Sequence, residues 1–171
     1  MILSFSTGKP DAFMANLDTE NFLIRRIVPS DIGDYYDIRF SVTENRIHPH
    51  QIHLLQREVV LENINSSGGA ICVDRHSGVA AGAMMILITS KPMISALFVR
   101  PEYQGLGIGK ALLDRAIEMS RAAGVDVLTL VTDPGSRADT FYQRQGWTRG
   151  GLDEYGTQVI FTKRILDGHD D

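Results

Sequence analysis

The spacing of apolar and polar positions changes along the chain, and it predicts a mixed α/β fold. Short apolar runs bounded by turn residues are typical of strands, whereas apolar positions three or four residues apart are typical of helices. The pattern predicts strands over residues 22–28, 70–74, 79–88, 93–99, 125–131 and 158–165. It predicts helices over about residues 31–42, 51–64, 108–123 and 136–145.

The order of these elements suggests how the sheet is built. Hairpin-sized turns join the strands 70–74, 79–88 and 93–99, so we expect them to be antiparallel neighbours. From Ile108 the pattern is helical up to Gly124, and the next strand is apolar on both faces, which fits a central position. A strand, a helix and a parallel strand make a βαβ crossover. We therefore expect a mostly antiparallel sheet that is flanked by helices and becomes parallel near its middle.

Composition indicates one ordinary globular domain. Hydrophobic residues make up 43% of the 171 residues and charged residues 22%. We expect an N-terminal extension over residues 1–20, one domain over 21–166 and a flexible tail over 167–171. The formal charge of −4 is not that of a general nucleic-acid binder.

Targeting and redox signals point to the cytoplasm. The N-terminal residues lack the basic and apolar regions of a signal peptide, and no apolar stretch reaches the ~20 residues that cross a bilayer. The single cysteine, Cys72, lies in an apolar run and is expected to be a buried hydrophobe rather than a reactive thiol. We therefore predict a cytoplasmic protein with no membrane and no nucleic-acid partner.

A glycine-rich segment at a strand-to-helix junction is the main candidate for chemistry. The N–H groups that open a helix have no internal partner and carry partial positive charge, so they bind phosphate well. A plain tight turn is the alternative. The segment Gly109-Lys110-Ala111 lacks the hydroxyl residue of a phosphate-binding NTPase loop. The glycines also come too late, and with the wrong spacing, for a dinucleotide-binding fold.

Two segments resemble one family. The segment Gln104-Gly105-Leu106-Gly107-Ile108-Gly109 is similar to the acyl-CoA signature of the GCN5-related N-acetyltransferases (GNAT), Gln/Arg-x-x-Gly-x-Gly/Ala. About 30 residues later, residues 138–147 are similar to the family's second CoA segment, Ala-x-x-Phe-Tyr-x-x-x-Gly-Phe/Trp. The resemblance implies the GNAT fold and transfer of an acetyl group from acetyl-CoA to a primary amine of a small molecule or a protein, by direct attack on the thioester and without a metal.

The resemblance also assigns the donor site. It implies that pantetheine pairs with the strand backbone and that the glycine loop holds the pyrophosphate. Tyr142 would protonate the leaving thiolate, unless it is only a core aromatic. Ser136 would reach the cofactor, unless it is only a helix cap. The predicted cofactor-binding residues are Leu97, Phe98, Val99, Gln104, Gly105, Leu106, Gly107, Ile108, Gly109, Lys110, Ser136, Phe141 and Tyr142.

The acceptor side is less defined. Many relatives carry a glutamate on the strand before the glycine loop as general base, but residues 93–99 contain no acid and no histidine. The polar loop 41–50 is the candidate acceptor site, with Glu44 as a catalytic or substrate-binding carboxylate and Asn45 and His48 as further substrate-binding residues. A solvated loop is the alternative. The missing strand-borne base also keeps open a non-catalytic CoA-binding sensor or scaffold, and a homodimer is possible because many relatives dimerise.

Overall fold

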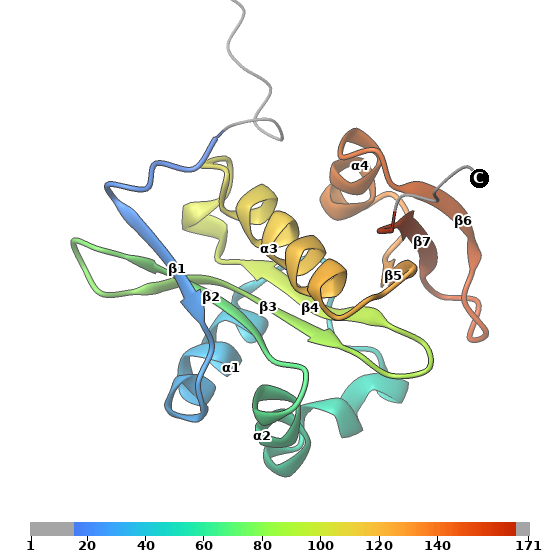
Figure 1. Ribbon diagram of the computed structural model, residues 1–171, viewed down its shortest axis with the longest axis horizontal. Coiled ribbons are helices and arrows are strands. Elements are labelled where there is room, and N and C mark those ends of the chain that lie inside the picture. Colours follow the sequence, from blue (N-terminus) through green and yellow to red (C-terminus); the bar gives the residue numbers. More distant parts are fainter. Residues whose placement is uncertain (1–15, 167–171) are drawn as a thin grey trace, which may run out of the picture.

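The computed structural model describes residues 16–166, and the expectations for residues 1–15 and 167–171 lie outside this part. Within the described range, seven strands form one mixed sheet in the order β1-β2-β3-β4-β5-β7-β6 (Figure 1). The strands are β1 Phe22–Arg26, β2 Gly69–Asp74, β3 Ala80–Leu87, β4 Met93–Val99, β5 Val127–Thr132, β6 Thr148–Leu152 and β7 Val159–Arg164.

Helices cover both faces of this sheet. α3 lies across β2, β3 and β4 on one face, α1 and α2 lie on the opposite face, and α4 lies beside the β5-β7-β6 part (Figure 1). The α-helices are α1 Ile32–Ser41, α2 Arg57–Asn65, α3 Ile108–Ala122 and α4 Arg137–Arg144. The 3-10 helices are η1 Pro29–Asp31, η2 Pro49–Leu55 and η3 Pro101–Tyr103.

Alternating strand residues feed two hydrophobic cores. On β2, Ala70 and Cys72 belong to the core under α3, whereas Ile71 belongs to the core under α1 and α2. This division follows from the period of two in a strand, which sends successive side chains to opposite faces. The first core continues under β5 and β7 and includes Tyr142 and Trp147. The predicted fold class, a mostly antiparallel sheet flanked by helices with a βαβ crossover, is confirmed.

The parallel pair at the middle of the sheet is short. β4 and β5 share only the register pair Met93↔Thr129 in the described residues, and the Thr129 N–H donates to the Pro92 carbonyl at 3.3 Å. Every other neighbouring strand pair has at least three register partners. The carboxyl ends of β4 and β5 therefore diverge and leave an opening in the sheet.

Three sequence predictions need correction. The helix predicted over residues 51–64 is instead η2, an extended residue at Gln56 and then α2. The strand β6 was not predicted, because all of its residues are exposed and it contains Gly150 and Gly151, which hide the alternation. β5 is fully buried on one face only: Leu128, Leu130 and Thr132 are buried, whereas Val127 is exposed and Thr129 and Val131 are half-buried.

The described elements run from β1 at Phe22 to β7 at Arg164, and the domain bounds 21–166 stay a prediction. β1 begins one residue after the predicted domain start, although Leu17 already packs against the core. None of the helices within residues 16–166 is both long enough and apolar enough to cross a membrane.

Candidate functional site

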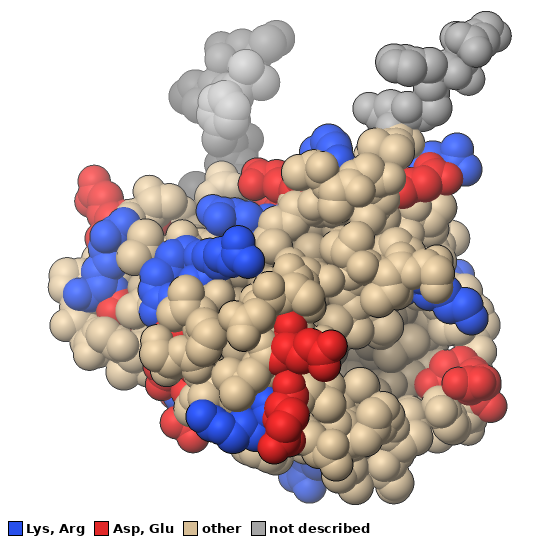
Figure 2. Space-filling model, turned by 60° about the horizontal axis from the view of Figure 1, so that its bottom comes forward, with Lys and Arg blue, Asp and Glu red and all other residues tan. Residues whose placement is uncertain are grey.

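A cavity of about 420 Å³ occupies the opening between β4 and β5. It is lined from one side by the glycine loop and α3, and from the other by the loop between α1 and η2. β4 contributes a continuous stretch to its wall, residues 93–99. With the lower edge of Figure 1 turned forward, the surface is hollowed, and most of the surface around the hollow is uncharged (Figure 2).

The glycine loop forms one end of this cavity. Gly105 and Gly107 have φ angles of 81° and 86°, in the left-handed region that favours glycine. Gly107 is the N-cap of α3, and its carbonyl accepts the hydrogen bond from Ala111 N at 3.1 Å. The N–H groups of Ile108–Lys110 therefore precede the first intrahelical bond and are available to an anion. This arrangement fits a pyrophosphate.

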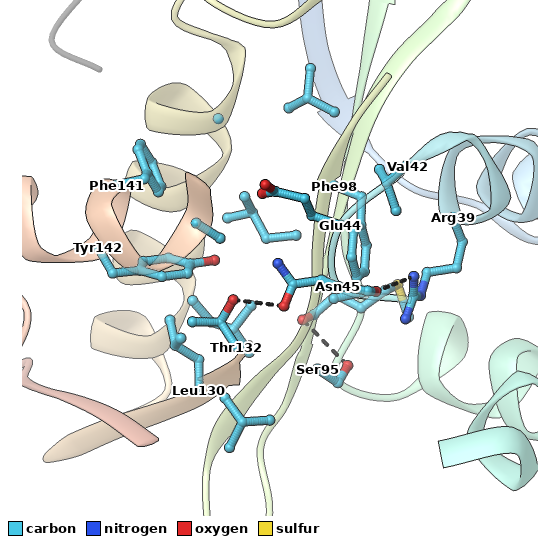
Figure 3. A pocket seen from close by; sticks show the side chains of 18 of the residues that line it. Arg39, Val42, Glu44, Asn45, Ser95, Phe98, Leu130, Thr132, Phe141 and Tyr142 are labelled. Atoms are coloured by element: carbon cyan, nitrogen blue, oxygen red, sulfur yellow. Dashed lines mark hydrogen bonds between the residues drawn. The ribbon is translucent and has the colours of Figure 1, made fainter. Parts of the chain in front are cut away.

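Tyr142 lies in the wall opposite β4. Its ring packs between Phe141, Trp147 and Phe161, and the residue is 5% exposed. Its hydroxyl points into the cavity (Figure 3), and within residues 16–166 it has no hydrogen-bond partner. Burial raises the pKa of this phenol above its usual range, so the hydroxyl keeps its proton at neutral pH and is available as a donor.

Glu44 and Asn45 connect the α1–η2 loop to the end of β5 and the start of α4. The Glu44 carboxylate accepts a hydrogen bond from Arg137 N at 2.7 Å, at the first residue of α4. The Asn45 side-chain oxygen accepts hydrogen bonds from Thr132 Oγ1 at 2.8 Å and Asp133 N at 2.7 Å. Both side chains line the cavity (Figure 3). Asn45 adopts a φ of 52°, which an asparagine tolerates better than most residues.

His48 lies outside the cavity wall. Its Nε2 is 2.8 Å from Asp133 Oδ1, and its ring stacks with His50, which in turn stacks with Tyr155. The same Asp133 oxygen accepts a hydrogen bond from Gln158 Nε2 at 3.1 Å. In this arrangement His48 joins the α1–η2 loop to the loops that follow β5 and β6.

Most of the predicted site residues lie together at the cavity. Those that line it are Leu97, Phe98, Val99, Gln104, Gly105, Gly107, Ile108, Gly109, Lys110, Phe141, Tyr142, Glu44 and Asn45. Leu106, Ser136 and His48 do not line it.

Two of the predicted cofactor contacts have other partners in the structure. Ser136 is the N-cap of α4, where its Oγ accepts from Asp139 N and donates to the Asp133 carbonyl. The Lys110 ammonium pairs with Asp114 at 3.1 Å. Contact of either side chain with CoA remains a prediction.

Sequence reasoning missed several polar residues of the wall. Arg39, Asn63, Ser95 and Thr132 line the cavity. Arg39 could have been found, because it falls on the apolar stripe that Tyr35 and Ile38 mark on the same helix. Thr132, Ser95 and Asn63 carry no comparable signal, since single polar residues within strands and helices or at their ends are common.

Other chemistry receives no support from the described residues. Between residues 16 and 166, no group of three or more His, Cys, Asp or Glu side chains is arranged to hold a metal ion. Cys72 is fully buried, and burial raises the pKa of its thiol to about 12, as expected for a structural cysteine.

Comparison with known proteins places this site in a family. The family model "Acetyltransferase (GNAT) family" matches residues 34–147, which include the glycine loop and the segment of Tyr142. An uncharacterized N-acetyltransferase, ycf52-like, of Prochlorococcus marinus is 40% identical over 63 residues. That alignment covers 37% of this chain and 32% of the relative, so the chain matches about a third of the relative's length.

Solved structures share the fold. The PaiA N-acetyltransferase of Thermoplasma acidophilum, in complex with coenzyme A, superposes with a TM-score of 0.67 at 21% identity, over 84% of this chain and 98% of that one. YncA of Salmonella typhimurium, a putative acetyltransferase with acetyl-CoA, gives 0.64 at 18% identity, over 88% and 98%. Because the family model spans more than half of the sequence, the chain belongs to the GNAT acetyltransferase family.

Proposed function

We propose that this protein transfers the acetyl group of acetyl-CoA to a primary amine. The observation that carries the proposal is the arrangement at the cavity between β4 and β5. The helix N-terminus after Gly107 forms one end, and the Tyr142 hydroxyl points into the space from the opposite wall. Membership of the GNAT family and two structural neighbours that hold CoA or acetyl-CoA support the same donor.

Different groups of the protein would bind different parts of acetyl-CoA. The N–H groups that open α3 would hold the pyrophosphate, and the β4 edge at Leu97–Val99, which has no β5 partner, would hydrogen-bond the pantetheine amides. The Tyr142 hydroxyl would donate a proton or a hydrogen bond to the departing thiolate. A protonated phenol suits this role, since burial disfavours its anion.

The acceptor must reach the thioester as a neutral amine. An alkyl ammonium has a pKa of ~10, so a proton has to leave before attack. Glu44 is the only carboxylate among the described cavity residues. Its negative charge would attract the ammonium form of the acceptor, and water beside it would carry the proton away. No acid on β4 takes that role.

A CoA-binding sensor is the second candidate. The lack of a carboxylate or histidine on β4 favours it, because nothing on that strand would accept the proton of the amine. The sensor would bind acetyl-CoA at the same loop without turnover. The unpartnered Tyr142 hydroxyl favours the enzyme, since a binding module needs no proton donor at the thioester.

A thiol-release assay separates these two functions. The full chain would be mixed with acetyl-CoA and, in turn, with polyamines, aminoglycosides, amino acids and peptides with free N-termini. We expect free CoA to appear with at least one class and the acetylated amine to be found by mass spectrometry. Calorimetric binding of acetyl-CoA without product from any amine would contradict acetyl transfer and support the sensor.

A further inference from the structure

A buried arginine on the acceptor side of the cavity has no acidic partner. Arg39 lies in the last turn of α1, lines the cavity and is 8% exposed. Its guanidinium lies 4.1 Å from the centre of the Phe98 ring, and one nitrogen donates to the Asn45 carbonyl at 2.9 Å. Within residues 16–166, no carboxylate lies within 4 Å of it.

The contacts of Arg39 compensate its burial only in part. A guanidinium has five N–H donors, and the Asn45 carbonyl takes one of them. The Phe98 ring and the C-terminus of α1 favour a cation but do not neutralise it. Burial is also the largest influence on the pKa of Arg39, and it lowers that pKa. A buried charge without a counter-charge is costly, so it is typically paired when the site is filled.

Neither Asp133 nor Glu44 pairs with Arg39. Asp133 is close enough for its charge to favour the Arg39 cation, but its carboxylate is bonded to His48 and Gln158. Glu44 is bonded to Arg137 N at the start of α4. Since no described carboxylate lies within 4 Å of Arg39, its remaining N–H groups have no acidic partner among residues 16–166.

The composition of the cavity wall indicates the chemical character of the rest of the ligand. Apart from the four charged residues Arg39, Glu44, Lys110 and Arg137, the cavity is lined by neutral residues, and most of them are apolar.

We propose that the acceptor carries a carboxylate that binds the Arg39 guanidinium, and that it is an amino acid with an apolar side chain. This inference rests on the proposed acetyl transfer and names the substrate class for it. A guanidinium and a carboxylate form two parallel hydrogen bonds, which would fix the orientation of the acceptor. Glu44 would then face the amine, and the apolar wall would enclose the side chain.

The test compares matched amines. The wild-type full chain would be assayed with acetyl-CoA and with leucine, leucinamide and 3-methylbutylamine, and with the same three forms of methionine and phenylalanine. We expect product from the amino acids. We define the preference as kcat/KM for the amino acid divided by kcat/KM for its amide. Arg39→Met should lower this preference by about 10- to 100-fold, because a hydrogen bond to a charged group is lost. Dividing the variant's preference by that of the wild type cancels the different basicity of the amines.

Two controls make the result specific. Arg100→Met removes an arginine that lies outside the cavity wall and donates to the Ala80 carbonyl, and it should leave the preference unchanged. Arg39→Lys keeps the charge and should retain part of the preference. Calorimetry should show the same acetyl-CoA affinity in all variants.

An amine-free probe covers the case in which Arg39→Met does not fold. Calorimetry of the wild type with CoA would compare 4-methylpentanoate, which is leucine without its amine, with 4-methylpentanamide. Tighter binding of the carboxylate by about 10-fold supports the proposal, and equal or absent binding overturns it.

The outcomes separate this inference from the proposed function. Amino acids and amides that react alike, with no effect of Arg39→Met on their ratio, would overturn the carboxylate site and leave acetyl transfer intact. Selective binding of 4-methylpentanoate without thiol release from any amine would contradict acetyl transfer and leave the carboxylate site intact.

Discussion

The exchange Tyr142→Phe tests the proton-donor role with little structural disturbance. It removes one hydroxyl and keeps the ring that packs against Phe141, Trp147 and Phe161. In the described residues this hydroxyl has no hydrogen-bond partner, so no protein bond is broken. The free energy of unfolding should therefore change little, because no protein hydrogen bond is lost and the ring keeps its packing.

Turnover should respond very differently. The hydroxyl points into the cavity where the thioester would lie, and the residue is 5% exposed, so water would replace the lost donor poorly. A positioned general acid contributes roughly 10²-fold to 10⁴-fold. We expect kcat to fall by ~10²-fold, which corresponds to about 2.7 kcal/mol in the activation free energy. Acetyl-CoA affinity should change little, because the hydroxyl acts on charge that develops during the reaction.

The assay pairs thiol release with thermal unfolding. Tyr36→Phe is the matched control, since its hydroxyl donates to the Leu55 carbonyl at 2.7 Å and it lies outside the cavity wall. The control should lose about 1 kcal/mol of stability and keep its kcat, the reverse of the expected result for Tyr142. Wild-type turnover in Tyr142→Phe would refute the proton-donor role and show that this tyrosine serves only to pack the core.

Three further predictions concern the loop, the acceptor and acid stability. Gly107→Val should abolish the binding of acetyl-CoA measured by calorimetry. The control Gly78→Val, at a glycine with a similar φ of 73° in an exposed hairpin turn, should keep it. Equal acetyl-CoA affinity in both variants would contradict the proposed role of the glycine loop in binding the pyrophosphate. Glu44→Gln should raise the KM for a cationic acceptor about 10-fold without changing the acetyl-CoA KM, and an unchanged acceptor KM would show that the carboxylate only caps α4. The Arg149 guanidinium, bonded to Asp139 at 2.9 and 3.0 Å, lowers the pKa of that carboxyl to about 2. A carboxyl whose pKa is lower in the folded than in the unfolded chain stabilises the fold at pH values above the unfolded pKa of ~3.9, and this stabilisation disappears as the pH falls toward 2. Asp139→Asn should therefore lose about 1–3 kcal/mol of unfolding free energy at pH 7 and much less near pH 2, as measured by denaturant unfolding. A loss of stability that does not depend on pH would contradict this linkage.

Local sequence patterns determined much of the fold. Helical spacing from Ile108 and the stop at Gly124 predicted α3, which ends at Ala122. Alternation and short turns predicted the antiparallel β2, β3 and β4. These elements could be predicted because the signal lies within a few neighbouring residues. The pattern failed where tertiary contacts compete with it, as in η2, where the Gln51 side chain bonds to His48 N and to Gln158.

The donor loop was predictable for the same reason. Its function depends on consecutive backbone N–H groups and on left-handed φ angles at Gly105 and Gly107, and both are properties of one short segment. The sequence by itself therefore determined the family, the fold class and the segment predicted to hold acetyl-CoA.

Only the tertiary structure decided what faces that segment. The divergence of β4 and β5 after one register pair creates the cavity, and the hydrophobic pattern of neither strand predicts this divergence. Asn45 bonds to Thr132 and Asp133 across 87 and 88 residues of sequence, and Arg39 meets Phe98 from another element. Such contacts arise from the packing of whole helices and strands, so the acceptor side became visible only when the chain was folded.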